Sequence, residues 1–430
     1  MPRPALACLV AFVVGVGAPS PAHAQAGPAS CTTAGKNLYV RDVMSNLYLW
    51  YADMPDLDPT SFASPEAYLQ AVRHLPLDAT FSYITSRAAN DAFFSESQFI
   101  GFGLSTALGE IDMLVTQVFP DSPASEAGLS RGDRIVAIGG QDVAALISSG
   151  EIDAAFGPSE IGVEKDIAFV SPDGARHEAH MVKGLVTIPT VSLTRVYAAG
   201  GRRIGYIFFR NFVEPSYAAL DAAFAELSAA GLDDLVLDLR YNGGGLVNVA
   251  QHLASYIGGV RTDGQVFAEF FHNDKNAFRN RFLSFEAKPN QLTLDRLIVV
   301  TTRASASASE LVINALRPFM PVVIVGDTTY GKPVGQYAIG FCDKLLAPVS
   351  FSLRNADGQG DFFDGFAPDC TAPDDASHQL GDPEEGSLKE ALTVAATGTC
   401  SRRPLASQRH ADRPRHPRRV LGWQSVVNAY

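Results

Sequence analysis

The feature that most constrains this chain is an alternation of short apolar runs with segments of helical spacing over residues 204–325. We expect strands at residues 204–209, 235–239, 297–302 and 322–325, with helices at 216–229, 246–257 and 307–316 between them. The run from Leu235 to Leu239 is apolar except at Asp238, as in a strand buried on both faces. Such alternation predicts parallel strands covered by helices, and therefore an α/β core.

Two other patterns precede this core. Residues 36–95 carry apolar residues at spacings of three and four, and Ser64 with Pro65 is typical of a helix start, so we expect a small helical cap. From about Phe99 the chain changes to short β-rich runs. We expect strands at residues 100–104, 113–118 and 134–138, with a short helix near 122–129.

Composition fits a multi-domain globular protein. The 430 residues are 47% hydrophobic and 19% charged, with a net charge of -12. The last 30 residues are rich in Arg and Pro with little periodicity, so we expect a basic, disordered tail at residues 401–430. The rest of the chain is correspondingly more acidic, which argues against nucleic acid as a partner.

The amino terminus has the pattern of a signal peptide. Arg3 precedes an apolar run from Ala5 to Val16, and Ala22-His23-Ala24 supplies small residues for cleavage. We expect residues 1–24 to be removed and the mature protein to be periplasmic or secreted by a bacterium, without an integral membrane segment. An uncleaved amino-terminal anchor is the alternative.

Four cysteines would remain after this cleavage: Cys31, Cys342, Cys370 and Cys400. An even number in an oxidising compartment indicates disulfides, with three possible pairings. We favour Cys342 with Cys370, which flank one apparent hairpin, and Cys31 with Cys400, which would join the two ends of the folded region. Cysteine and histidine spacings typical of metal sites are missing from the sequence, so we expect no metal.

Ser307 and Lys332 carry the clearest chemical signal. Small residues surround Ser307, and its helix start would present polarised N–H groups to a developing oxyanion. Lys332 follows a predicted strand and a turn, and burial there would lower its pKa toward that of a working base. A lysine of this kind activates a serine without histidine. Taken alone, Ser307-Ala308-Ser309-Glu310 is a structural capping box.

A glycine-rich segment, Asn242-Gly243-Gly244-Gly245, directly follows the predicted strand at residues 235–239. Glycines at such a place let the backbone approach a ligand closely, although a simple tight turn has the same pattern. Nucleotide-binding spacings are absent. Ser130 lies in a literal G-x-S-x-G, but it follows a helix and precedes a strand, the reverse of a nucleophile elbow.

Together these features resemble the carboxyl-terminal processing peptidases, also called tail-specific proteases. Ser307 and Lys332 lie 25 residues apart and Gln336 follows four residues later, as in that family, although Pro333 stands where the family often has glycine. The resemblance implies that Ser307 is the nucleophile, Lys332 the general base and Gln336 its orienting partner. It also implies oxyanion donors at the N–H groups of Ala308 and Gly245, with Gly244 second, and no cofactor.

The β-rich region resembles a PDZ domain. In that family a glycine-containing loop and the adjoining strand receive the carboxylate of a peptide terminus, and the peptide adds a strand to the sheet. The resemblance implies that Gly101, Phe102, Gly103 and Leu104 bind peptide. A structural β domain without a ligand is the alternative.

The expected fold class is therefore a multi-domain α/β protein with a crotonase/ClpP-like core, an inserted PDZ-like domain and an amino-terminal helical cap. The expected limits are residues 25–96 for the cap, 97–183 for the PDZ-like domain and 184–400 for the peptidase core. The function implied is a serine endopeptidase that cleaves unstructured or carboxyl-terminal regions of exported proteins with apolar termini. A catalytically silent peptide-binding scaffold is the main alternative, and a crotonase-type hydrolase or isomerase is a third.

Overall fold

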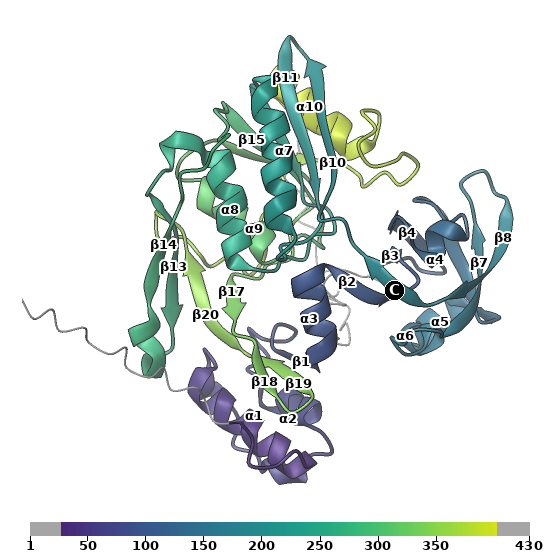
Figure 1. The fold of residues 1–430 in the computed structure, drawn as a ribbon, viewed down its shortest axis with the longest axis vertical. Helices are drawn as coiled ribbons and strands as arrows, with labels where there is room; N and C mark the ends of the chain where they lie inside the picture. The colour runs from purple at the N-terminus through teal and green to yellow at the C-terminus, as the bar shows by residue number, and fades with distance from the viewer. Residues whose placement is uncertain (1–26, 402–430) are drawn as a thin grey trace, which may run out of the picture.

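The computed structural model of the protein describes residues 27–401. The signal peptide predicted at residues 1–24 lies outside the described residues, as does the predicted basic tail after Ser401. In Figure 1 the described chain forms a helical base, a β-rich lobe at one side and a larger α/β core. This mixture confirms the predicted α/β fold class with its helical amino-terminal region.

A six-stranded sheet lies at the centre of the core, in the order β10-β11-β12-β15-β16-β21. The strands are β10 (Val191–Ala199), β11 (Arg202–Phe209), β12 (Asp234–Asp238), β15 (Arg296–Thr301), β16 (Val322–Gly326) and β21 (Cys370–Thr371). Strand β10 is antiparallel to β11, and all other neighbours are parallel. The parallel strands predicted from the alternating pattern are confirmed.

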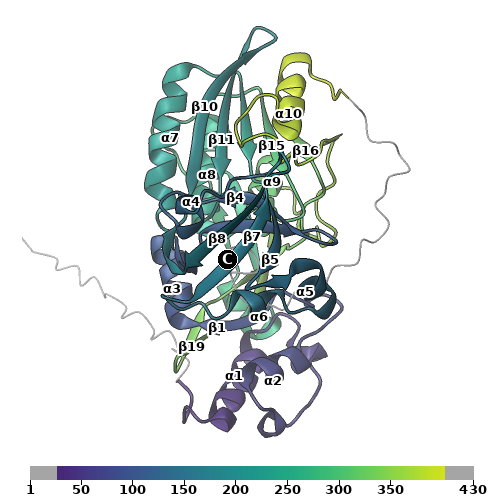
Figure 2. The ribbon, with the colours of Figure 1, turned by 90° about the vertical axis from the view of Figure 1, so that its right-hand side faces the viewer.

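Helices cover both faces of this sheet (Figure 2). They are α7 (Ser216–Ala230), α8 (Val247–Gly258), α9 (Ala308–Leu316) and α10 (Gly386–Thr397). Ile207 and Leu237 pack in one apolar cluster with α7, α8 and α9, whereas Tyr206 and Val236 pack with α10 on the other face. Because side chains alternate along a strand, a strand covered on both faces is largely apolar, which explains the apolar runs in the sequence. The buried Asp234 and Asp238 of β12 are paired with arginines.

A smaller sheet in the order β14-β13-β20-β17 flanks the core, and a three-stranded sheet β1-β19-β18 connects it to the base. The strands are β1 (Tyr83–Ser86), β13 (Val266–His272), β14 (Arg281–Ser284), β17 (Val334–Gln336), β18 (Ile339–Phe341), β19 (Lys344–Ala347) and β20 (Val349–Arg354). The base has α1 (Thr33–Leu47), α2 (Pro65–Val72) and α3 (Arg87–Glu96). Short 3-10 turns lie at Tyr51–Asp53, Pro59–Ser61, Gly259–Arg261 and Asp274–Arg279.

The base departs from its prediction at one strand. The helix start at Ser64 is confirmed, because its side chain caps α2. Strand β1, however, lies within the segment expected to be helical. It pairs with β19, so that Tyr83 lies opposite Ala347. A partner this distant in sequence leaves no local signal, and the tertiary pairing overrides the helical spacing.

The β-rich lobe has a sheet in the order β3-β4-β5-β7-β8, with β6 beside β5. Its elements are β3 (Leu104–Leu108), β4 (Met113–Val118), β5 (Arg134–Ile138), β6 (Gln141–Asp142), β7 (Glu164–Val170), β8 (Arg176–Val182), α4 (Pro123–Glu126), α5 (Val143–Ser149) and α6 (Ile152–Phe156). A separate pair, β2 (Gln98–Gly101) with β9 (Gly184–Thr187), leads into and out of the lobe. The run expected as one strand at residues 100–104 is broken at Gly103, whose φ is 88°.

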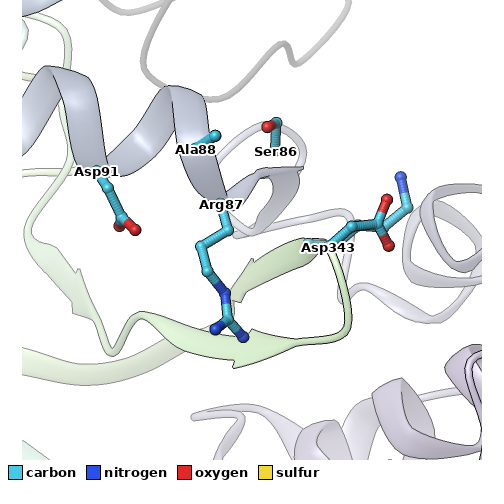
Figure 3. A pocket seen from close by; sticks show the side chains of 6 residues that line it. Ser86, Arg87, Ala88, Asp91 and Asp343 are labelled. Carbon is cyan, nitrogen blue, oxygen red and sulfur yellow. The ribbon is translucent and has the colours of Figure 1, made fainter.

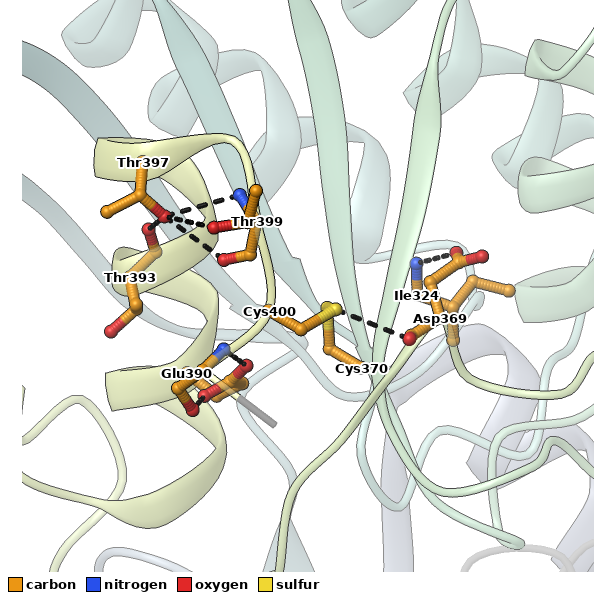
Figure 4. The surroundings of a disulfide bond; sticks show 9 residues. Ile324, Asp369, Cys370, Glu390, Thr393, Thr397, Thr399 and Cys400 are labelled. Carbon is orange, nitrogen blue, oxygen red and sulfur yellow. Dashed lines mark hydrogen bonds between the residues drawn. A yellow bond between two sulfur atoms is a disulfide. The ribbon is translucent and has the colours of Figure 1, made fainter. Parts of the chain in front are cut away.

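Two disulfides join Cys31 to Cys342 and Cys370 to Cys400. The pairing favoured from the sequence is therefore wrong. Cys342 lies in the turn between β18 and β19, whereas Cys370 lies in β21 of the core sheet, so these two cysteines belong to different sheets. Figure 4 shows Cys400, just after α10, bonded to Cys370. Because these sulfurs are bonded to each other, the nearby Glu390 does not complete a thiolate metal site.

Among residues 27–401, no helix has the length and apolar character needed to cross a bilayer.

Candidate active site

Loops that follow four core strands meet at the carboxyl edge of the central sheet. They follow β11 at residues 210–212, β12 at 239–246, β15 at 302–307 and β16 at 327–333. In an open α/β sheet this edge is where ligands bind, since the loops after parallel strands converge there. Ser307, Lys332 and the glycine loop are thus brought to one edge by the topology.

Ser307 is the residue that precedes α9, and its backbone is in an unusual conformation with φ 55°. A positive φ is uncommon for a residue other than glycine and is often found at functional sites. The side chain is partly exposed, and the first N–H groups of α9 lie beside it. These groups give the helix start a partial positive charge.

The two neighbouring serines differ from Ser307 in their hydrogen bonds. The hydroxyl of Ser305 donates to the carbonyl oxygen of Leu239, and that of Ser309 donates to the carbonyl oxygen of Asn242, each at 2.8 Å. Both side chains are fully buried. Ser305 and Ser309 therefore hold the glycine loop against the start of α9, whereas Ser307 between them is left toward the surface.

Glu310 links the Ser307 and Lys332 loops. One carboxylate oxygen accepts hydrogen bonds from the backbone N–H groups of Ser307 and Lys332, at 2.8 and 2.9 Å. The other accepts from the N–H of Gly331 at 2.7 Å and from the hydroxyl of Thr329 at 2.6 Å. The sequence predicts only the local bond to Ser307, as half of a capping box. The three bonds to residues 329–332 have no signal in the sequence.

Lys332 lies deep in the protein, although part of its side chain remains accessible. Its ammonium donates to the side-chain oxygen of Gln336 at 2.7 Å and lies 5.8 Å from the centre of the Phe81 ring. Burial lowers the pKa of Lys332 to about 8, against the opposing attraction of Asp78 and Glu310. A substantial neutral fraction is thus available near neutral pH, as a general base requires.

The orientation of Gln336 is fixed by its amide nitrogen. This nitrogen donates to the backbone carbonyl oxygens of Phe81 and Ala347. A nitrogen directed at two carbonyls leaves the side-chain oxygen toward Lys332. Phe81 belongs to the segment after α2, so the amino-terminal part of the chain contributes to this site, which the sequence did not predict.

The glycine loop touches Ser307 directly. A Cβ atom built on Gly244 would lie 2.8 Å from the Cβ of Ser307 and 2.8 Å from the nitrogen of Ala308. Gly244 has φ 99°, and its N–H donates to the side chain of Asn242 at 2.9 Å. In the described part of the chain the N–H groups of Gly245 and Ala308 form no hydrogen bond. Two backbone donors are therefore free: the N–H of Ala308, which directly follows Ser307, and the N–H of Gly245, which follows Gly244 in the glycine loop.

The predicted peptide-binding residues lie between β2 and β3. Phe102, Gly103 and Leu104 are buried, and β3 is an edge strand of its sheet. Two carbonyl oxygens of this loop already accept hydrogen bonds. That of Phe102 accepts from the N–H of Ala124 and that of Gly103 accepts from the N–H of Phe119, each at 2.8 Å. Gly101 ends β2 opposite Gly184.

Other candidate sites lie elsewhere. Ser130 is exposed in the turn before β5, where its N–H donates to Asp133.

A surface hollow of about 500 Å³ lies at the start of α3 (Figure 3). It is lined by Ser86, Arg87, Ala88, Asp91, Asp343 and Lys344. Both basic and acidic side chains line this hollow. None of the predicted site residues lines it, so it is separate from the carboxyl edge of the central sheet where Ser307 lies (the Ser307 edge).

Among the described residues no hydrogen bond joins the Ser307 hydroxyl to the Lys332 amine. In enzymes without bound substrate such bonds are often long and tighten when substrate binds.

Models of three protein families match the chain. Peptidase family S41 matches residues 203–372, the peptidase S41 N-terminal domain matches 36–83, and the PDZ domain matches 114–155. The family match spans β11 to β21 and includes both Ser307 and Lys332. These matches cover the base, the β-rich lobe and the core.

Relatives that the chain resembles in sequence are named as processing proteases. The chain is 30% identical over 246 residues to a chloroplastic C-terminal processing peptidase of Tetradesmus obliquus, covering 54% of this chain and 50% of the relative. It is 28% identical over 264 residues to a carboxy-terminal-processing protease of Bartonella bacilliformis, covering 60% and 58%. The chain thus spans about half the length of these relatives.

Solved structures match over most of the chain. A crystal structure from Bacteroides fragilis, described as an S41 protease, superposes with a TM-score of 0.68 at 26% identity, covering 84% of this chain and 97% of the other. The photosystem II D1 C-terminal processing protease superposes with a TM-score of 0.54 at 22% identity, covering 85% and 99%. The second likeness is one of fold.

Proposed function

Because the chain belongs to peptidase family S41, we propose that it is a serine endopeptidase that works through a Ser307–Lys332 dyad and an acyl-enzyme. The neutral amine of Lys332 accepts the hydroxyl proton of Ser307, and the serine oxygen attacks the carbonyl carbon of the scissile peptide bond. The C–N bond then breaks, and the Lys332 ammonium gives its proton to the leaving amine. Water attacks the resulting ester by the same route and regenerates Ser307.

The N–H groups of Gly245 and Ala308 stabilise the oxyanion in this proposal. Both N–H groups are free, Ala308 directly follows Ser307, and Gly245 follows Gly244, which packs against Ser307. Gly244 is second in this role, since its N–H already donates to Asn242. Gln336 is a positioning residue that holds the amine of Lys332.

The substrates in this proposal are unstructured or carboxyl-terminal regions of exported proteins. A peptide with an apolar terminus binds at Gly101 to Leu104 and adds a strand to the free edge of β3. Two disulfides support a location in the periplasm or outside the cell, because disulfides persist in oxidising compartments.

The observation that carries the proposal is the set of bonds around Ser307. Glu310 accepts hydrogen bonds from both the Ser307 and the Lys332 loops. The hydroxyls of Ser305 and Ser309 already donate to the backbone carbonyl oxygens of Leu239 and Asn242. Ser307 is consequently the serine left for chemistry. Its removal should reduce hydrolysis on the order of 10⁶-fold, as for other serine nucleophiles.

A serine-reactive fluorophosphonate probe followed by mass spectrometry tests this proposal. The probe should label Ser307, and Ser307→Ala should lose both the label and hydrolysis of an unstructured peptide. Ser130→Ala is the control, because Ser130 is exposed and lies in the β-rich lobe; it should keep both. Binding of peptide without any adduct or cleavage would instead favour a catalytically silent scaffold.

A further inference from the structure

Asp78 is a buried acid of the amino-terminal base, in the turn between α2 and β1. One carboxylate oxygen accepts hydrogen bonds from the backbone N–H groups of Phe81 and Ser82, at 2.9 and 2.8 Å. The other accepts from the hydroxyls of Ser82 and Tyr48, at 2.6 and 2.9 Å. Four donors on one carboxylate hold the turn at residues 78–82 in shape and favour the charged form of the acid.

This turn carries Phe81 to the Lys332 side of the candidate site. The carbonyl oxygen of Phe81 accepts a hydrogen bond from the amide nitrogen of Gln336. The side-chain oxygen of Gln336 in turn accepts from the ammonium of Lys332 at 2.7 Å. Asp78 is therefore connected to the lysine amine through Phe81 and Gln336, although the acid belongs to the base and the amine to the core.

The same turn contacts the segments on either side of Gln336. The hydroxyl of Thr80 forms a hydrogen bond with that of Tyr330 at 2.8 Å, in the loop that leads to the lysine. The hydroxyl of Ser82 accepts from the N–H of Val349 at 2.9 Å, and Val349 lies opposite Gln336 in the pairing of β17 with β20. A displacement of the turn would thus be passed to both segments that place the lysine.

The charge of Asp78 also reaches the site. Asp78 and Glu310 are the acids that act on the amine of Lys332, and both oppose the burial that lowers its pKa to about 8. Glu310 acts from α9, whereas Asp78 acts from the base. Arg73, at the end of α2, and Tyr48 are the groups that interact with Asp78 itself. Since a nearby negative charge favours the ammonium, removing the charge of Asp78 would favour the neutral amine.

We propose that Asp78 is a positioning residue for Lys332, which holds the Phe81 carbonyl that orients Gln336 and places a negative charge near the lysine amine. The inference deepens the proposed function and rests on it. It makes the helical base a part of the catalytic apparatus, because the amine takes both its orientation and part of its electrostatic environment from a residue of the base.

The pH profile of kcat/KM for an unstructured peptide, measured with the full chain, tests this inference. Asp78→Asn removes the charge but keeps an oxygen that can accept from the N–H groups of Phe81 and Ser82, so the folded variant should keep its plateau within about ten-fold. The midpoint of the rise with pH should move down by at least about 0.5 pH unit, because the neutral amine of Lys332 is then formed more easily. A purely structural role would lower the plateau and leave the midpoint in place.

Tyr48→Phe is the matched control, because it removes one hydrogen bond from the same carboxylate without removing its charge. Its midpoint should equal that of the unsubstituted chain. Ser82→Ala tests the turn with the charge in place, also in the event that Asp78→Asn does not fold. In folded Ser82→Ala the plateau should fall at least about ten-fold, with the midpoint unchanged, since a small displacement of the base slows the reaction strongly.

The outcomes separate this inference from the proposed function. An unmoved midpoint in folded, active Asp78→Asn would overturn the electrostatic role of Asp78, and an unchanged plateau in folded Ser82→Ala would overturn the positioning role of the turn. Either result leaves the dyad intact, because the fluorophosphonate probe would still label Ser307. Failure of the probe to label Ser307 in the unsubstituted chain would instead contradict the catalytic proposal on which this inference rests.

Discussion

Glu310 is the residue on which the geometry of the candidate site most depends. It is fully buried, and burial raises the pKa of its carboxyl despite the four donors around it. Each of these donors belongs to the Ser307 or the Lys332 loop, so one side chain sets the distance between the proposed nucleophile and the proposed base. A serine–lysine pair formed by two separate loops needs such a connection, because small displacements of reacting groups cost large factors in rate.

Glu310→Gln should therefore disturb both stability and catalysis. In this variant an amide nitrogen, itself a donor, would replace a carboxylate oxygen that now accepts two hydrogen bonds, and it would face those two donors. We therefore expect the free energy of unfolding to fall by about 2–4 kcal/mol. Peptide hydrolysis should fall at least ten-fold in the protein that remains folded. Glu384→Gln is a suitable control, because Glu384 forms an exposed pair with Lys389 and should change stability by less than about 0.5 kcal/mol. Denaturant unfolding and hydrolysis rates measure both effects.

The pH dependence of activity should report Lys332. Its pKa is lowered to about 8 by burial, and the proposed mechanism uses the neutral amine. Below that pH the neutral fraction falls ten-fold for each unit, so kcat/KM should rise with pH and level off above about 8. Lys332→Arg should abolish hydrolysis, because a guanidinium keeps its proton. A profile that is flat from pH 6 to 9 would exclude this lysine as the base.

At the scale of elements, the glycine loop after β12 and the start of α9 are packed too closely for any side chain between them. A Cβ at Gly244 would meet Ser307, Ala306 and Ala308 at 2.8 Å, and the φ of 99° disfavours residues other than glycine. Backbone contact of this kind fixes the glycine loop, of which Gly245 is the next residue, against the serine. The loop cannot move away from α9 without losing the bonds of Ser305 and Ser309.

Gly244→Ala should consequently reduce kcat at least about a hundred-fold, the size of losing one oxyanion donor. Gly128→Ala is the matched control, since Gly128 also has a positive φ of 80° but nothing lies within 4 Å of its added Cβ. The control should lose about 1 kcal/mol of stability from its backbone conformation and keep its activity. Steady-state kinetics of the two folded variants separate the loss of kcat caused by the contact with Ser307 from any loss caused simply by replacing a glycine of positive φ. Equal kinetic losses would mean that the contact with Ser307 is unimportant.

The sequence predicts elements well where periodicity is strong and poorly where partners are distant. The run at residues 235–239 is buried on both faces and corresponds to β12, and residues 307–316 correspond to α9 with the serine that precedes it. Strand β1 escapes prediction because its partner β19 is distant in the sequence. Strand β10 is also missing from the predicted strands, although it forms a local hairpin with β11 across Gly200 and Gly201, a signal that the sequence does carry. The sequence could predict that Ser307 begins a helix and that Lys332 follows a strand and a turn. The roles of Glu310 toward residues 329–332 and of Phe81 toward Gln336 could not, since these bonds join segments far apart in the chain.

At the scale of the whole molecule, the amino-terminal base and the core depend on each other. Phe81 holds Gln336, and the ammonium of Lys36 pairs with Asp343 at 2.7 Å beside the Cys31–Cys342 disulfide. The β-rich lobe is also bonded to the core, because Arg131 donates to the hydroxyl of Tyr241 at 2.6 Å and pairs with Asp374 at 2.8 Å. Tyr241 directly precedes Asn242 of the glycine loop. All three parts of the chain thus contact segments that form the Ser307 edge.

The two disulfides should differ in how much they stabilise this arrangement. Cys31 and Cys342 are separated by 311 residues, whereas Cys370 and Cys400 are separated by 30. If each bond acts by restricting the unfolded chain, the chain-entropy estimate is about 6 kcal/mol for the long loop and about 4 kcal/mol for the short one. The two loops do not overlap in sequence, so their contributions should be additive.

Replacing Cys31 and Cys342 together by Ser should therefore lower the free energy of unfolding by about 2 kcal/mol more than replacing Cys370 and Cys400. Denaturant unfolding of both double variants under non-reducing conditions measures the difference, and peptide mapping of the unsubstituted protein checks the pairing itself. In reductant the three proteins should converge, because the bonds are then broken in all of them. A larger loss on removing Cys370 and Cys400 would mean that the short bond acts mainly in the folded state, by holding the segment after α10 against β21 of the core sheet.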